Sequence, residues 1–97
     1  ASRFARELAD AGPAGRFLID VREPAEFARG HIRGAVNIPL SQLAERIGEI
    51  PADRKIFVYC QSGVRSRRAA RMLKKRGCRD IVHLNGGLAS WRGETVR

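Results

Sequence analysis

Four short apolar runs recur along the chain, separated by polar and glycine-rich segments. The run at 55–60 is the most distinct, because residues 56–59, "IFVY", are continuously apolar, as in a strand that is buried on both faces of a parallel sheet. The other runs are bounded by glycine, proline or charged residues, which favour turns. The pattern therefore predicts four strands, over residues 16–21, 34–39, 55–60 and 80–84.

Between these runs, apolar residues recur at helical spacing. The clearest helix spans residues 64–76, with an apolar inner face, a basic outer face and Gly77 in the C-cap position. Ser41 is a favourable N-cap, and with Glu45 it predicts a helix that ends near Pro51. Shorter helices are predicted at 2–8, before the breaker "AGPAG" of residues 11–15, and at 24–28 and 85–91.

The alternation of strands and helices defines the expected architecture. Parallel strands need crossover connections, so the order predicts an α/β fold with a mostly parallel sheet and helices on both faces. The chain has 97 residues, the size of one small domain, and we treat residues 1–97 as a single domain. In such a fold, ligands bind beyond the carboxyl ends of the strands, and Cys60 follows one of these ends.

Composition and charge narrow the possible functions. The chain is 43% hydrophobic and 30% charged, which is typical of a globular protein. Its net charge of +9 favours anionic small molecules, acidic proteins, nucleic acid or anionic lipid as partners. No apolar run approaches the roughly 20 residues of a membrane helix, so we expect no membrane segment in this chain.

The two cysteines indicate the redox environment. Cys60 and Cys78 are too few for the disulfide framework of a small secreted fold. Their spacing from His31 and His83 fits no zinc pattern, so no metal is expected. A reducing compartment is the simpler prediction, and we expect the cytoplasm, with the periplasm left open.

The segment after the most distinct strand holds the most specific pattern in the sequence. It is "CQSGVR", residues 60–65, and the next helix begins at Val64 or Arg65. The first amides of a helix have no acceptor within the helix, and Gly63 permits the positive φ that curls successive amides around an anion. The guanidinium of Arg65 suits a planar or tetrahedral anion. The segment therefore predicts an anion-binding loop that faces Cys60.

Cys60 itself can be a packed core thiol, a metal ligand or a nucleophile. A helix N-terminus and nearby cations favour the thiolate, so its pKa should fall below the free value of about 8.5. Core packing does not require glycine at the third following position or arginine at the fifth, so this arrangement favours the nucleophile. The predicted substrate- or anion-binding residues are those of the loop: Gln61, Ser62, Gly63, Val64, Arg65 and Ser66.

Three long segments, in this order, resemble the rhodanese-like domain family. They are "LIDVREPAEFARGHIRGAVNIP" at 18–39, "VYCQSGVRSRRAARML" at 58–73 and "LNGGLASWRG" at 84–93. The resemblance implies a three-layer fold with a parallel sheet of about five strands. It also implies sulfurtransferase activity, in which Cys60 takes a sulfur atom from thiosulfate or a persulfide donor and passes it to a thiol or cyanide. Neither a metal nor an organic cofactor is implied.

Loop length separates the activities of this superfamily. The related phosphatases and arsenate reductases have one more residue between cysteine and arginine, whereas this chain has the shorter sulfurtransferase spacing from Cys60 to Arg65. A cysteine-based phosphatase or arsenate reductase is the first alternative function. The second is a sulfur-relay or docking module of a larger protein, with a sulfur-relay protein as its partner.

The resemblance also indicates where this chain departs from the family. A short strand usually precedes the first helix, but only Ala1, Ser2 and Arg3 precede Phe4. We expect this edge strand to be missing or cut away, as in a domain of a larger protein. The neutral Gln61 occupies a position thought to tune substrate choice, which leaves thiosulfate and persulfide donors both open.

Other polar and aromatic residues are predicted to have structural roles. Asp20 should accept hydrogen bonds that fix neighbouring loops, and Arg22 is a possible residue of the pocket rim. We expect His31 to bond to backbone in a turn, and His83 to be a satisfied core or edge histidine. The remaining expectations are that Glu23 and Glu26 flank the short helix, that Gly86 and Gly87 form a tight turn, that Trp91 packs beneath the loop it faces, and that Cys78 is a semi-buried bystander.

The basic face of the helix at 64–76 is a candidate nucleic-acid site. It has no interleaved aromatic residues and no strand platform that could bind bases. A solvated face that raises the local potential for anionic donors explains these cations more simply. We therefore expect no nucleic-acid partner.

Overall fold

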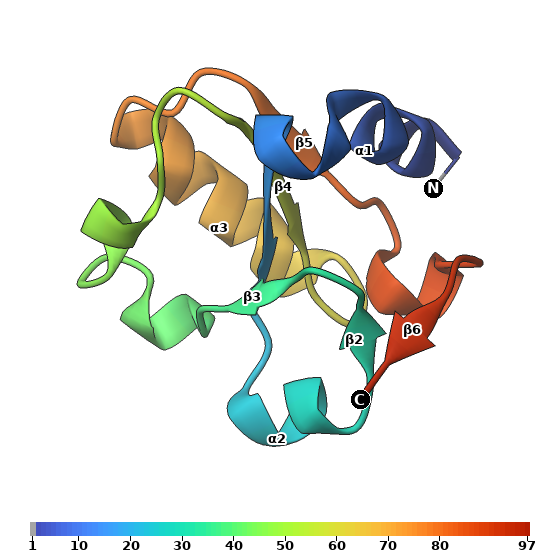
Figure 1. Cartoon of the computed structure of the whole chain (residues 1–97). Coiled ribbons are helices and arrows are strands. Elements are labelled where there is room, and N and C mark those ends of the chain that lie inside the picture. The colour runs from blue at the N-terminus through green and yellow to red at the C-terminus, as the bar shows by residue number, and fades with distance from the viewer. Residues whose placement is uncertain (1) are drawn as a thin grey trace.

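The structure is a computed structural model that describes residues 2–97, and it is an α/β fold (Figure 1). Its helices are α1 (Ser2–Gly15), α2 (Pro24–Ala28) and α3 (Val64–Lys75), with short 3₁₀ helices η1 (Leu40–Gln42), η2 (Ile47–Glu49) and η3 (Gly87–Ser90). Its strands are β1 (Arg16–Asp20), β2 (His31–Ile32), β3 (Val36–Asn37), β4 (Lys55–Tyr59), β5 (Ile81–His83) and β6 (Thr95–Val96).

The main sheet is parallel and has the order β3-β1-β4-β5. These are the four strands that the apolar runs predict, so this part of the prediction is confirmed. Within residues 2–97 the sheet has four strands, rather than the five or so that the family resemblance implies. The expectation of a missing strand before α1 depends partly on Ala1, which lies outside the described residues.

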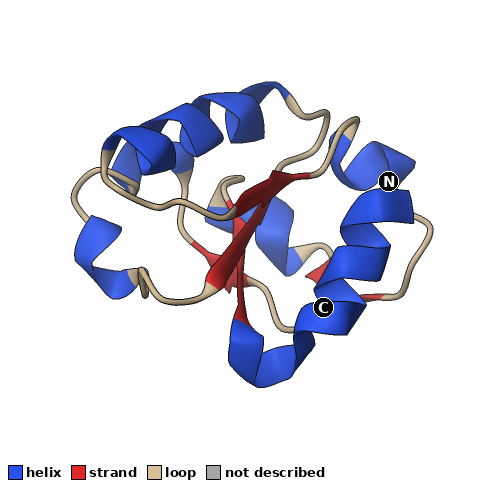
Figure 2. Cartoon of the chain, turned by 90° about the horizontal axis from the view of Figure 1, so that it is seen from above, coloured by secondary structure: helices blue, strands red, loops and turns tan. Residues whose placement is uncertain are grey.

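Each face of the sheet is covered by a different helix, and the two views of the chain show the helices on opposite sides of the strands (Figures 1 and 2). On one face, Phe4 and Leu8 of α1 join a core with Phe57 and Tyr59 of β4. On the other face, alternate residues of β4 pack with Ala69 and Leu73 of α3, in the core that contains Cys60. The alternation of side chains along β4 therefore directs Cys60 towards α3.

The second strand pair was not predicted. β2 and β6 are antiparallel, with His31 opposite Val96 and Ile32 opposite Thr95. Each strand has only two residues, too short for its hydrophobic pattern to stand out in the sequence. The pair brings the C-terminal segment next to the loop after α2 (Figure 1).

The predicted helix from Ser41 to near Pro51 is wrong. This segment forms the 3₁₀ helices η1 and η2, joined by turns. The apolar spacing was right about burial, because Leu43 and Ile50 lie in the core. These two side chains can be buried without a regular helix, and Gly48 makes an α-helix unfavourable here.

Two other helix boundaries differ from the prediction. α1 continues past Leu8 and bends at Gly12, whose φ of 71° and ψ of 166° are non-helical, so the chain breaks within the predicted segment 11–15, but a further helical turn carries α1 on to Gly15. The final helix is only η3, a 3₁₀ turn over Gly87–Ser90. Among residues 2–97, no helix has the length and apolar character needed to cross a membrane.

Candidate active site

Cys60 lies directly after β4, at the carboxyl end of a central strand of the sheet. The cysteine loop, residues 60–65, connects β4 to α3 and turns at Gly63, which has a φ of 101°. The thiol accepts hydrogen bonds from the backbone N–H groups of Gly63, at 3.0 Å, and Ser66, at 3.3 Å. The predicted concave arrangement of amides is therefore present, and it is directed at Sγ.

The carbonyl of Gly63 fixes the shape of this loop. It accepts hydrogen bonds from the backbone N–H of Arg67 at 3.1 Å and the hydroxyl of Ser66 at 3.3 Å. It also accepts one from Nε2 of His83 at 3.1 Å. His83 is thus a satisfied histidine, as predicted, and it ties the loop to β5.

The pKa of Cys60 is shifted below its ordinary value. Burial of the thiol acts to raise this pKa, but hydrogen bonds from Ser66, and from the backbone of Gly63 and Ser62, outweigh burial and lower it. Burial raises the pKa of Cys78, for which no opposing hydrogen bond acts. The direction predicted for Cys60 is confirmed, and it favours a thiolate at neutral pH.

We expect the alkylation rates of the two cysteines to rise at different pH values. Because the folded pKa of Cys60 is lowered, its reaction with iodoacetamide should reach half its maximal rate at a lower pH than that of Cys78. Both rates are measured by mass spectrometry of peptides from samples that react at a series of pH values between about 5 and 10, the range in which thiols titrate. Equal midpoints would contradict the role given to the loop amides.

Arg65 is held by Glu26 of α2. Nη1 and Nη2 donate to the two carboxylate oxygens of Glu26 at 2.7 and 3.0 Å. The hydrogen bond from Arg65 is the largest cause of a lowered Glu26 pKa, which falls to about 2. Glu26 also completes a capping box with Glu23 at the start of α2, so both glutamates flank this helix as expected. Direct binding of an anion by Arg65 stays a prediction.

Asp20 and Arg22 form a buried ion pair beneath the site. The side chains of Arg22 and Asp20 are 4% and 0% exposed, and Nη2 of Arg22 lies 2.8 Å from Oδ2 of Asp20. Arg22 also donates to the carbonyl of Gly30 at 2.7 Å and to Oε1 of Gln61 at 3.2 Å. Asp20 thus fixes a neighbouring loop as expected. It does so through Arg22, which lines the pocket.

The segment 86–89 holds the cysteine loop in place through backbone hydrogen bonds. This supporting role was not predicted from the sequence. The N–H of Leu88 donates to the carbonyl of Cys60 at 2.8 Å, and that of Ala89 to the carbonyl of Gln61 at 3.1 Å. Gly86 and Gly87 have φ values of 77° and 63°, so the predicted tight turn is confirmed. The "GG" pair was the available signal, because adjacent glycines also allow two backbone segments to approach closely.

The remaining candidate residues lie away from the thiol or serve the framework. Nδ1 of His31 lies 2.9 Å from the carbonyl of Phe27, so the predicted bond to backbone is confirmed, although His31 lies in strand β2 and not in a turn. The ring of Trp91 packs edge-on against Phe4 of α1, at 5.9 Å between centroids. Cys78 is a free, buried cysteine in the core beside α3.

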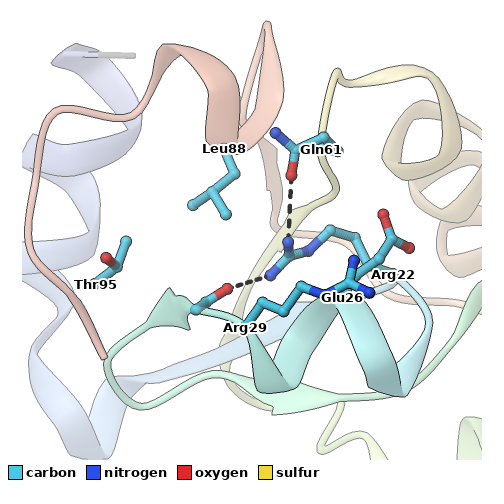
Figure 3. A pocket seen from close by; sticks show the side chains of 7 residues that line it. Arg22, Glu26, Arg29, Gln61, Leu88 and Thr95 are labelled. Carbon is cyan, nitrogen blue, oxygen red and sulfur yellow. Dashed lines mark hydrogen bonds between the residues drawn. The ribbon is translucent and has the colours of Figure 1, made fainter. Parts of the chain in front are cut away.

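A pocket of about 490 Å³ opens beside the cysteine loop (Figure 3). Its lining residues come from the loop, from α2 and its flanks, and from the C-terminal segments. They are Arg22, Glu26, Arg29, Gly30, Gln61, Leu88 and Thr95. Cys60 is fully buried and lies behind Gln61 rather than among the lining residues.

Fold and site together define a class: an α/β protein with a cysteine in a loop between a central parallel strand and a helix, where backbone amides point at the thiol. The sequence profile described as rhodanese-like domain matches residues 1–94. The chain belongs to this family.

Individual relatives agree with this assignment. The uncharacterized protein YqhL of Bacillus subtilis is 57% identical over 77 residues, which cover 79% of this chain and 61% of that protein. Thiosulfate sulfurtransferase GlpE of Shewanella oneidensis is 38% identical over 74 residues, covering 76% of this chain and 73% of that enzyme. The crystal structure of a rhodanese-related protein from Thermoplasma volcanium matches with a TM-score of 0.83 and 35% identity, over 95% of this chain and 93% of that one. This chain spans only 23% to 61% of the length of several curated relatives.

Proposed function

We propose that this chain is a sulfurtransferase that carries sulfur as a persulfide on Cys60. The observation that supports it most directly is the set of amides around Sγ, from Gly63 at 3.0 Å and Ser66 at 3.3 Å. These groups stabilise a negative charge on or next to the sulfur atom without a cation in contact with it. The family assignment supports the coarser statement, a sulfurtransferase or rhodanese-domain role.

The proposed reaction has two balanced steps. In the first, the Cys60 thiolate attacks the outer sulfur of thiosulfate, a new S–S bond forms, and sulfite leaves with the electron pair of the broken bond. In the second, the thiolate of an acceptor, or cyanide, attacks the outer sulfur of the persulfide. The bond to Sγ breaks, and its electron pair returns to Cys60 as a thiolate. Gln61, Ser62, Val64 and Arg65 complete the loop that surrounds the transferred atom.

The phosphatase alternative is less well supported. Hydrolysis of a phosphate ester needs an acid that protonates the leaving group. The two carboxylates described at this site, Asp20 and Glu26, are both engaged by arginines. The six-residue loop is also the shorter of the two lengths that occur in the superfamily.

A sulfur-relay role within a longer protein is the second candidate. The burial of Cys60, with 0% of the residue exposed, favours this role, because a buried persulfide is shielded from water and from thiols other than the intended acceptor. We expect such a relay to operate in the cytoplasm, where both free cysteines stay reduced.

Mass spectrometry after incubation with thiosulfate tests the proposal. We expect the wild-type chain and Cys78→Ser to gain one sulfur atom on Cys60, and Cys60→Ser to gain none. Cys78→Ser is the matched control, because it removes the other thiol and leaves the loop intact. Absence of the adduct with both thiosulfate and an organic persulfide, together with turnover of an aryl phosphate, would refute the proposal.

A further inference from the structure

The pocket beside the cysteine loop is larger than the transferred group requires. Its volume of about 490 Å³ lies in the range of roughly 300–1,000 Å³ that is common for organic small-molecule sites. A single sulfur atom or a sulfonate would occupy only a fraction of this space. The pocket therefore has room for an organic molecule that delivers or removes the sulfur.

One residue of the cysteine loop lines this pocket, and two contacts link the loop to other lining residues. Gln61 is the residue after the nucleophile, and the N–H of Leu88 donates to the carbonyl of Cys60 at 2.8 Å. Glu26 pairs with Arg65, the last residue of the loop. A ligand in this pocket therefore lies next to the loop that holds the thiol.

The charges that line the pocket do not cancel. Arg22 is neutralised by Asp20, and Glu26 by Arg65. The remaining charged lining residue is Arg29, at the C-cap of α2, and no salt bridge is found for it among residues 2–97. In Figure 3 its side chain lies along the wall opposite Gln61 and Leu88. One positive charge is therefore available to a ligand.

The orientation of Gln61 adds a hydrogen-bond donor. Arg22 has only donors, so the amide of Gln61 must present its oxygen to the guanidinium, at 3.2 Å. The NH₂ group is then turned away from Arg22, as Figure 3 shows. Leu88 supplies an apolar surface between this amide and the C-terminal segment, where Thr95 contributes a hydroxyl.

We propose that this pocket binds the sulfur acceptor, a small aliphatic thiol that carries a carboxylate, and that Arg29 selects it by pairing with that carboxylate. The thiol end lies towards the cysteine loop, the aliphatic part lies against Leu88, and the NH₂ group of Gln61 donates to a polar atom of the ligand. This inference rests on the proposed function. The thiolate attacks the outer sulfur of the Cys60 persulfide and leaves as an organic persulfide, while Cys60 regains its thiolate.

Three thiols that differ in charge provide the test. The chain is loaded with thiosulfate, freed of donor, and mixed with 3-mercaptopropionate, 2-mercaptoethanol or cysteamine. Rapid quenching and mass spectrometry give the rate at which Cys60 loses its persulfide, expressed per unit of thiolate. We expect the wild type to prefer 3-mercaptopropionate over cysteamine by about fivefold, the scale of a partly exposed ion pair.

Variants separate a specific site from the overall charge of +9. Arg29→Gln should remove the preference, Arg29→Lys should retain most of it, and Arg29→Glu should favour cysteamine. Arg71→Gln is the matched control, because it removes one exposed charge from the outer face of α3, away from the pocket lining, and it should behave as the wild type. Arg29 is exposed, and within residues 2–97 no hydrogen bond of its side chain is found, so its variants should fold.

The outcomes distinguish this inference from the function on which it rests. Equal rates for all three thiols, or the same preference in Arg29→Gln as in the wild type, would overturn the inference. Such results leave the persulfide chemistry intact, because loading is measured first. A failure to load Cys60 at all would instead count against the proposed function.

Discussion

We expect Gly87→Ala to lower the free energy of unfolding by about 3 kcal/mol or more and to disrupt the cysteine loop. A Cβ at this position would lie 2.5 Å from the carbonyl carbon and oxygen of Gln61 and 2.6 Å from the carbonyl oxygen of Cys60. These are backbone atoms and cannot turn aside as a side chain can. The φ of +63° adds strain for any residue with a Cβ. Thermal unfolding should shift down by more than about 12 °C.

Gly34→Ala provides the matched control for this prediction. Gly34 also has a positive φ, +88°, but an added Cβ would meet nothing within 4 Å. Its substitution should therefore show the strain of the backbone alone, about 1 kcal/mol. If both variants lose the same stability, the close approach of segment 86–89 to the cysteine loop does not matter for folding.

Asp20→Asn should be the second strongly destabilising change, with a loss of about 3–5 kcal/mol. The substitution leaves the guanidinium of Arg22 charged, 3% exposed as a residue and without its carboxylate. Urea unfolding followed by circular dichroism measures the loss. Because Arg22 also contacts Gly30 and Gln61, the pocket should lose its shape together with the ion pair.

A double variant tests whether the cost comes from the unpaired charge. In Asp20→Asn with Arg22→Met, neither charge is buried, and most of the lost stability should return. A double variant that is as unstable as Asp20→Asn alone would show that the pair contributes through its specific contacts instead. The single and double variants thus separate the desolvation of Arg22 from its hydrogen bonds.

The sheet and the cysteine loop could be predicted from the sequence because their signals are local. The run "IFVY" before Cys60 and the glycine three residues after it encode strand, turn and helix within one short segment. The direction of the Cys60 pKa shift followed from the same segment, since the amides that lower it belong to residues 62–66. In such a case, local chain geometry brings the functional groups together.

The pairing of side chains across the site could not be predicted in this way. Arg65 is paired with Glu26, which is 39 residues away in the sequence. The bond between Arg22 and Gln61 also spans 39 residues. Such contacts depend on how α2 packs against the cysteine loop, which no local pattern encodes. Arg29 was overlooked for the same reason, because its importance depends on which neighbouring charges are already paired.

The helix predicted from Ser41 failed for a different reason. Apolar spacing reports which side chains are buried, and Leu43 and Ile50 are indeed in the core. It does not report the backbone conformation when a short segment can bury the same side chains through 3₁₀ turns. The cap-like residues Ser41 and Glu45 therefore had no α-helix to cap.

The groups that lower the pKa of Cys60 are peptide N–H groups and the side chain of Ser66, and neither a peptide group nor a hydroxyl gains or loses a proton in the physiological range. These hydrogen-bond donors to a negative sulfur atom consequently keep their protons as the pH changes. The pH dependence of sulfur transfer is then set by the two sulfur atoms between which the sulfur moves, one on Cys60 and one on the incoming thiol. A change of pH therefore acts on the transfer through these sulfur atoms, and not through the N–H and O–H groups that hold the sulfur in place.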